Sequence, residues 1–253
     1  MTTRLTFLPL LLCAALAACG RSEPEAPVVV PPVTQTLTEI AQYSLAAFAP
    51  EPSGIVYNTA RNSFYVVSDN HSDICEIDLR GRLLGRIPTQ GSDLEGVALS
   101  PTGDTLYIVE ERLRLVSLYT RSGSFLSSFA ADVATLPNNG LEGVTVSPDG
   151  RVHALNEKAP GMIIVSHPNG TRISQIPLSL ASDYSDIALV ASEQCYWIVS
   201  DESRTVMKTD LQGALITQWN LPFEKGEGIA LVRDTMYIVN DADAKLHVFL
   251  APK

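Results

Sequence analysis

The sequence predicts an all-β fold, a five-bladed β-propeller with four antiparallel strands in each blade. Three observations predict it: a motif that recurs five times, an even spacing between the copies, and a last copy that lacks one strand. Each copy opens with a serine or a glutamate directly before a short apolar strand. The opening residues are Ser53, Glu95, Glu142, Ser185 and Glu227. The steps between them are 42, 47, 43 and 42 residues, the spacing typical of four-stranded propeller blades.

Glycine-containing turns separate the strands within each copy. Ser100 to Gly103 follows one first strand, and Asp78 to Gly81 precedes a fourth strand. Glycine supplies the positive φ that such tight connections need. The second strands, such as Tyr107 to Val109, are apolar on both faces, and a strand of this kind is buried on both faces. His153 occupies an aromatic column of these strands, so we expect a core histidine and not a ligand.

The N-terminal segment predicts how the ring closes. Ile40 to Leu45 closely matches Ile173 to Leu178 and Ile216 to Leu221, which close the third and fourth copies. The fifth copy has only three strands of its own. We therefore expect the N-terminal strand to complete the last blade, which leaves few free sheet edges.

The first residues are expected to target the protein. Residues 1–18 have the features of a lipoprotein signal peptide, because Arg4 precedes a short apolar run. Leu16 to Cys19 resembles a lipobox, which implies cleavage before Cys19 and lipidation of that cysteine. Gly20 favours the outer membrane over inner-membrane retention. An ordinary signal peptide or a membrane anchor is the alternative, but the apolar run is too short to span a bilayer.

The rest of the chain divides into a tether and one domain. Residues 19–36 are rich in proline and predict a semi-rigid tether that holds the domain away from a membrane. Residues 37–253 form the predicted propeller domain, which we expect to be monomeric. We expect this cell-envelope protein to contact the membrane only through its lipid anchor. Cys75 and Cys195 fall in the first and fourth copies, which are not neighbours, so both are expected to be buried thiols without a disulfide.

The charge balance narrows the classes of partner. The formal net charge is −10, from 18 basic and 28 acidic residues. Phosphate binding needs clustered lysine and arginine, so a nucleic-acid partner is not expected. A divalent cation or a basic ligand suits this balance. The sequence also lacks nucleophile elbows, phosphate-binding glycine loops and zinc motifs, which makes a Ser/His/Asp hydrolase improbable.

Acidic residues mark both ends of the repeat and are the candidate site. In an antiparallel blade the start of the first strand and the end of the second lie on the same side of the sheet. The inner candidates, nearest the axis, are Glu95, Glu142 and Glu227. The outer candidates, about one strand spacing of ~4.8 Å further out, are Asp69, Glu111, Glu157, Asp201 and Asp241. Asp186 is a further candidate, although it stands where the other copies have glycine.

Calcium is the ion that such a set of acids suits. It takes six to eight oxygen ligands in flexible geometry, and Asn156 and Asn240 are neutral oxygen donors beside the outer acids. A structural role is the alternative, because an acid at the end of a second strand often binds turn backbone of the next blade. Repetition in all five copies favours that role for the outer acids. The inner set is present in only three copies, as an asymmetric ligand would require.

Two stretches of the chain resemble a known family. Pro52 to Ile55 with Tyr65 to Asn70, and Asp93 to Val97 with Tyr107 to Arg112, resemble the SdiA-regulated family of bacterial surface proteins, which is distantly similar to NHL-repeat propellers. The resemblance implies a five-bladed propeller with a bound calcium site, in which Glu95 and Glu111 match the acidic motif. It implies no activity. A weaker similarity to esterase-like, phytase-type propellers leaves hydrolysis open.

These observations lead to one leading hypothesis and two rivals. The leading hypothesis is a non-enzymatic, calcium-binding propeller lipoprotein of the envelope that presents its acidic face to a small-molecule or protein ligand. The first rival is a calcium-dependent hydrolase of phosphoester, ester or lactone bonds, in which the metal polarises the substrate or activates water. The second rival is an envelope scaffold whose acids are purely structural.

Overall fold

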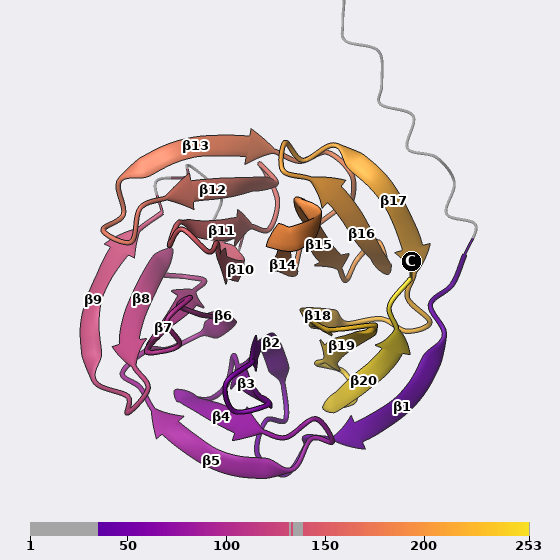
Figure 1. The fold of residues 1–253 in the computed structure, drawn as a ribbon, viewed down its shortest axis with the longest axis horizontal. Helices are drawn as coiled ribbons and strands as arrows, with labels where there is room; N and C mark the ends of the chain where they lie inside the picture. The colour runs from indigo at the N-terminus through magenta and orange to yellow at the C-terminus, as the bar shows by residue number, and fades with distance from the viewer. Residues whose placement is uncertain (1–34, 132, 134–138, 253) are drawn as a thin grey trace, which may run out of the picture. The chain divides into compact units, whose positions relative to one another are not determined.

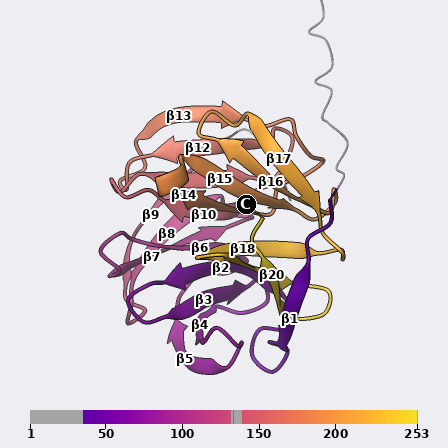
Figure 2. The ribbon, with the colours of Figure 1, turned by 45° about the vertical axis from the view of Figure 1, so that its right-hand side comes forward.

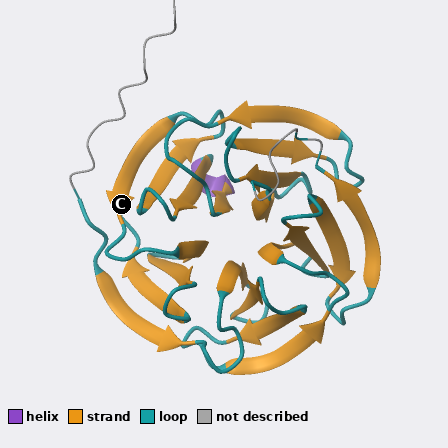
Figure 3. Ribbon diagram, turned by 180° about the vertical axis from the view of Figure 1, so that it is seen from behind, coloured by secondary structure: helices purple, strands orange, loops and turns teal. Residues whose placement is uncertain are grey.

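The structure, a computed structural model, describes residues 35–131, 133 and 139–252. These residues form five four-stranded antiparallel sheets arranged in a ring, as the repeats predict (Figure 1). The 3-10 turn η1 (Ala191–Glu193) is the one helical segment among them, and Figure 3 shows strands and loops elsewhere. No helix in this part of the chain is long and apolar enough to cross a membrane. The expected signal peptide, Cys19 and the tether up to residue 34 lie outside the described residues.

Four blades follow the chain outward from the centre of the ring, where the first strand of each lies (Figure 1). The first blade comprises β2 (Pro52–Asn58), β3 (Ser63–Ser68), β4 (Asp73–Ile77) and β5 (Leu83–Pro88). The second comprises β6 (Leu94–Leu99), β7 (Thr105–Glu110), β8 (Leu115–Thr120) and β9 (Phe125–Ala130). The third comprises β10 (Leu141–Val146), β11 (Val152–Asn156), β12 (Met162–Ser166) and β13 (Arg172–Pro177). The fourth comprises β14 (Asp186–Val190), β15 (Cys195–Ser200), β16 (Thr205–Asp210) and β17 (Leu215–Asn220).

The fifth blade closes the ring with a strand from the other end of the domain. It comprises β18 (Gly226–Val232), β19 (Thr235–Asn240), β20 (Lys245–Leu250) and β1 (Glu39–Ser44). β1 pairs with β20 in antiparallel register, and the two strands lie side by side in Figure 2. This arrangement confirms the closure that the match between Ile40 to Leu45 and the other fourth strands predicts.

The core lies between neighbouring blades and is built by the second strands. All residues of β3 and β15 are buried, and only the first residue of β7 and of β19 is partly exposed. Between the first and fifth blades, the rings of Phe64 and Tyr237 lie 4.6 Å apart. Fully burying one large apolar side chain stabilises a fold by about 1.5–3 kcal/mol, so these contacts hold the blades together.

Three residues singled out in the sequence belong to this core. Cys75 and Cys195 are buried free thiols in separate apolar clusters. His153 is 7% exposed, and its Nδ1 lies 2.9 Å from the Tyr196 hydroxyl. Burial lowers the pKa of His153 to about 4, so the ring is neutral at physiological pH. It is a core histidine, as predicted.

Candidate functional site

The opening residues reach the centre of the ring through β-bulges. In four blades the register of the innermost strand shifts at the opening position, where one extra residue is accommodated. The residues at these positions are Ser53, Glu95, Glu142 and Glu227. A bulge bends its strand and re-aims the side chain of the extra residue. The bulges are therefore the local feature that places three glutamates at one mouth of the central channel.

That mouth is a cavity of about 260 Å³ with a strongly acidic lining. Two lysines, Lys158 and Lys225, and two serines, Ser53 and Ser185, also line it. The acidic residues that line it are Glu51, Asp69, Glu95, Glu142, Glu157, Asp183, Asp201, Glu202, Glu227 and Asp241. We call this cavity the acidic mouth.

The outer acids each lie directly after the second strand of a blade. β7, for example, ends at Glu110, so Glu111 belongs to the following loop. Two of these acids bind backbone of the next blade, since Asp201 Oδ1 accepts the Lys225 N–H at 2.5 Å and Glu111 Oε1 accepts the Gly140 N–H at 3.4 Å. The structural role expected as the alternative therefore applies to these two, and the second oxygen of Asp201 also pairs with the Lys225 ammonium at 2.8 Å.

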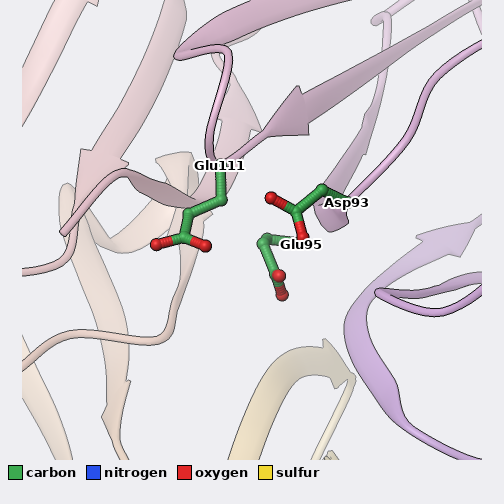
Figure 4. Close-up of side chains that lie close together, drawn as sticks. All are labelled: Asp93, Glu95 and Glu111. Carbon is green, nitrogen blue, oxygen red and sulfur yellow. The ribbon is translucent and has the colours of Figure 1, made fainter. Parts of the chain in front are cut away.

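Carboxylates converge in two groups between the second and third blades. Asp93, Glu95 and Glu111 offer oxygens that all lie within 4.8 Å of one another, and so do Glu111, Glu142 and Glu157. Figure 4 shows Asp93 and Glu95 side by side with Glu111 across from them. Glu111 belongs to both groups. It therefore links the inner glutamates of neighbouring blades.

The inner glutamates hold their protons unusually tightly. Burial, and then the nearby charges of Asp69, Asp93, Glu111 and Glu227, raises the pKa of Glu95 to about 8. Burial and the charges of Glu95, Glu111 and Glu157 raise the pKa of Glu142 well above its usual value. Burial also raises the pKa of Glu227 to about 7, with Asp201 adding to the shift and Lys225 opposing it. The fold thus gathers carboxylates whose ionised forms repel, which favours a cation between them.

The basic residues of the mouth are not evenly distributed. Lys158 Nζ lies 2.7 Å from Glu157 and 2.8 Å from Glu202. Lys225 Nζ lies 2.8 Å from Asp201 and 3.7 Å from Glu227. Within the described part of the chain, no lysine or arginine forms an ion pair with Glu95, Glu111 or Glu142. Among the described residues, Glu95, Glu111 and Glu142 therefore have no cationic partner, although their neighbours Asp93 and Glu157 each have one.

Asp186 does not line the acidic mouth. It is 1% exposed and lies near backbone amides of the innermost strands of other blades, at the position where the other four blades have glycine. Its Oδ2 accepts the Ile229 N–H at 2.9 Å, while Oδ1 has no hydrogen-bond partner among the described residues. Burial raises its pKa well above the usual value, although nearby backbone amides oppose the shift. A side chain on Gly143 would meet Asp186 Oδ1 at 2.7 Å, so Gly143 makes room for this aspartate.

A second cavity of about 560 Å³ lies at the other ends of the innermost strands. Its lining includes the turns Asn58 to Ala60 and Ser100 to Gly103 and the apolar residues Leu189 and Leu231. None of the described residues that line it is charged. The two ends of the channel therefore differ in chemistry, and charge is concentrated at the acidic mouth.

Sequence reasoning missed several residues that line the mouth or lie beside it. Asp93 and Asp183 stand two positions before the opening residue, as do Glu51 and Lys225 in their own blades. Asp93 accepts the Arg112 N–H at 3.1 Å, and Asp183 accepts the Glu202 N–H at 3.1 Å, so both cap a loop of their own blade. Aligning the copies two residues further upstream was the signal that would have found this column. Asn156 and Asn240, expected as neutral donors, use their side-chain amides to bind loop carbonyls.

Comparisons with known proteins agree with this architecture. A family model described as SdiA-regulated matches residues 33–244, whereas no curated protein matches the sequence. Virginiamycin B lyase from Staphylococcus aureus has 16% identity and a TM-score of 0.52, and the alignment covers 79% of this chain and 66% of that chain, just under two thirds of its length. The nidogen/laminin complex gives 14% identity, a TM-score of 0.55 and coverages of 75% and 72%. At these identities the solved structures show the fold alone, but the family model spans most of the sequence. The chain belongs to the SdiA-regulated family.

Proposed function

We propose that the protein is a calcium-binding β-propeller lipoprotein of the bacterial envelope, anchored to the outer membrane through Cys19, which presents its acidic mouth to a small-molecule or protein ligand. One observation carries the proposal. Two groups of converging carboxylates, Asp93/Glu95/Glu111 and Glu111/Glu142/Glu157, meet at Glu111, and no lysine or arginine of the described residues pairs with Glu95, Glu111 or Glu142. Calcium suits this donor set because it binds six to eight oxygens and tolerates irregular geometry. Asp93 and Glu157 are the further acids within reach.

The lining of the acidic mouth favours binding over catalysis. Neither histidine nor cysteine is among the described residues that line it. Its two hydroxyls are engaged, since Ser53 donates to the Leu94 carbonyl at 2.6 Å and Ser185 is hydrogen-bonded to Glu227. The rival function is that of a calcium-dependent hydrolase. A screen of phosphomonoesters, phosphodiesters and lactones, with and without chelator, distinguishes hydrolysis from binding alone. Turnover that disappears with the chelator would replace the binding role by the hydrolase.

Calorimetric titration tests the metal site. Calcium is titrated into the detergent-solubilised full-length protein, and we expect saturable binding that the double variant E95A/E142A loses. The matched control is D149N/E193Q, which removes two exposed acids outside the acidic mouth and should bind as the wild type does. Absence of binding to the wild-type protein would leave the acids a purely structural role.

A further inference from the structure

Two neighbouring groups of acids at the acidic mouth differ in one respect. One group comprises Glu111, Glu142 and Glu157, and the other comprises Glu157, Asp183 and Glu202. Within each group, the carboxylate oxygens lie within 4.8 Å of one another. In the second group a cation bridges two of the three acids, whereas in the first group it contacts only the shared Glu157. The ammonium of Lys158 lies between Glu157 Oε1 at 2.7 Å and Glu202 Oε1 at 2.8 Å.

Lys158 does in the second group what a metal ion would do. An ammonium between two carboxylates makes short, charge-assisted hydrogen bonds and offsets one negative charge. The third acid of this group, Asp183, is satisfied by neutral donors, because its Oδ1 accepts the Ser200 hydroxyl at 2.5 Å and the Glu202 N–H at 3.1 Å. A divalent ion would have to displace the tethered ammonium to enter.

We propose that Lys158 is a built-in counter-ion that fills the second acidic group and so limits the acidic mouth to one calcium ion, held at Glu95, Glu111 and Glu142. This inference rests on the proposed calcium-binding function and determines its stoichiometry. Lys158 occupies the place that a metal ion would take in the second group. Because Lys158 belongs to the loop that follows β11, its ammonium is covalently attached to the chain and cannot dissociate from the protein. Removing its charge, while keeping the three acids, should open a second calcium site.

The test is the number of calcium ions bound per chain, measured by calorimetry on detergent-solubilised full-length protein. We expect one ion for the wild type, two for K158M and for K158Q, and one for K158M/E202Q, which removes an acid of the second group. K245M is the matched control, because Lys245 is similarly exposed, pairs with Asp243 at 3.0 Å and does not line the mouth; one ion is expected.

The outcomes separate this inference from the proposed function. One ion in the wild type and one in both folded Lys158 variants would overturn the role of Lys158 and leave the first site intact. No ion in the wild type but one in K158M and K158Q would support the role of Lys158 and refute the site at Glu95, Glu111 and Glu142. Near-ultraviolet circular dichroism confirms that each variant is folded, and the two Lys158 substitutions guard against a side-chain-specific defect.

Discussion

Replacing Glu95 by glutamine should stabilise the calcium-free protein, an unusual result for a buried polar residue. Glutamine keeps the shape of the side chain but cannot ionise. The pKa of Glu95 is about 8 in the fold, against 4.5 for an unperturbed glutamate, because burial and neighbouring acids penalise the charge. At pH 7 the unfolded chain is ionised at this position while the folded chain must hold a proton. At about 1.4 kcal/mol per pH unit over the roughly 2.5 units between 4.5 and 7, the wild type is destabilised by about 3 kcal/mol.

The difference in stability between E95Q and the wild type should depend on pH. Below pH 4.5 both folded and unfolded chains carry the proton, so E95Q and the wild type should be equally stable. The advantage of E95Q should grow as the pH rises from 4.5 towards 8 and stay constant above it. Denaturant unfolding in chelator-treated buffer at pH 4 and pH 7 measures it. If E95Q is less stable than the wild type at pH 7 without calcium, the carboxylate is stabilised by the fold, and the repulsion inferred here does not exist.

Three further predictions address the metal, the packing of the ring and its closure. Calcium affinity should fall as the pH is lowered from 8.5 to 6.5, because protons on Glu95, with a pKa of about 8, and on Glu142, whose pKa is raised well above its usual value, compete with the ion. Calorimetry in buffers of different ionisation enthalpy should detect proton release, and a pH-independent affinity would contradict this competition. G96A should lower the unfolding free energy by several kcal/mol, because the new Cβ would lie 2.5 Å from the Glu142 carbonyl oxygen. The control G85A, whose new Cβ meets nothing within 4 Å, should change the unfolding free energy by less than about 1 kcal/mol. Equal effects of the two variants in denaturant melts would refute the close packing of the inner strands. A chain starting at Leu45 should lose cooperative unfolding, because β20 would lack its partner β1. A chain starting at Gln35 keeps β1 and should unfold as the full chain does. A cooperative melt of the shorter chain would disprove closure by β1.

The fold was predictable because its determinants are local and repeated. Each blade repeats the same strands and glycine turns, so even spacing identifies the blade and the unmatched segment Ile40 to Leu45 identifies the closing strand. Cooperative packing then follows from the second strands, which are apolar on both faces. His153 was correctly assigned to the core for the same reason, because its column is otherwise aromatic.

The site was predictable only in part, because it depends on loops. The sequence indicated that Glu95 and Glu142 lie at one mouth, but not that Glu111 belongs to a separate carboxylate group with each of them or that Asp93 and Asp183 take part. Those contacts depend on how the connecting loops fold, which has no periodic signature. The distribution of Lys158 and Lys225 also escaped sequence reasoning, although it decides which acids are left uncompensated.

Asp186 shows how a departure from the repeat can mislead. It directly follows Ser185, the equivalent of Glu95, yet it is buried and does not line the acidic mouth. It accepts the Ile229 N–H of the fifth blade, and Gly143 of the third blade leaves room for its carboxylate. An acid in a glycine column is therefore better interpreted as a residue that packs between the innermost strands than as a member of the acidic ring.

The central claim is that the protein holds a cation between Glu95, Glu111 and Glu142. An anomalous difference map from crystals grown with calcium tests it most directly. We expect one ordered peak within coordination distance of these three carboxylates. A peak confined to Glu157, Asp183 and Glu202, or no peak at the acidic mouth at saturating calcium, would contradict it.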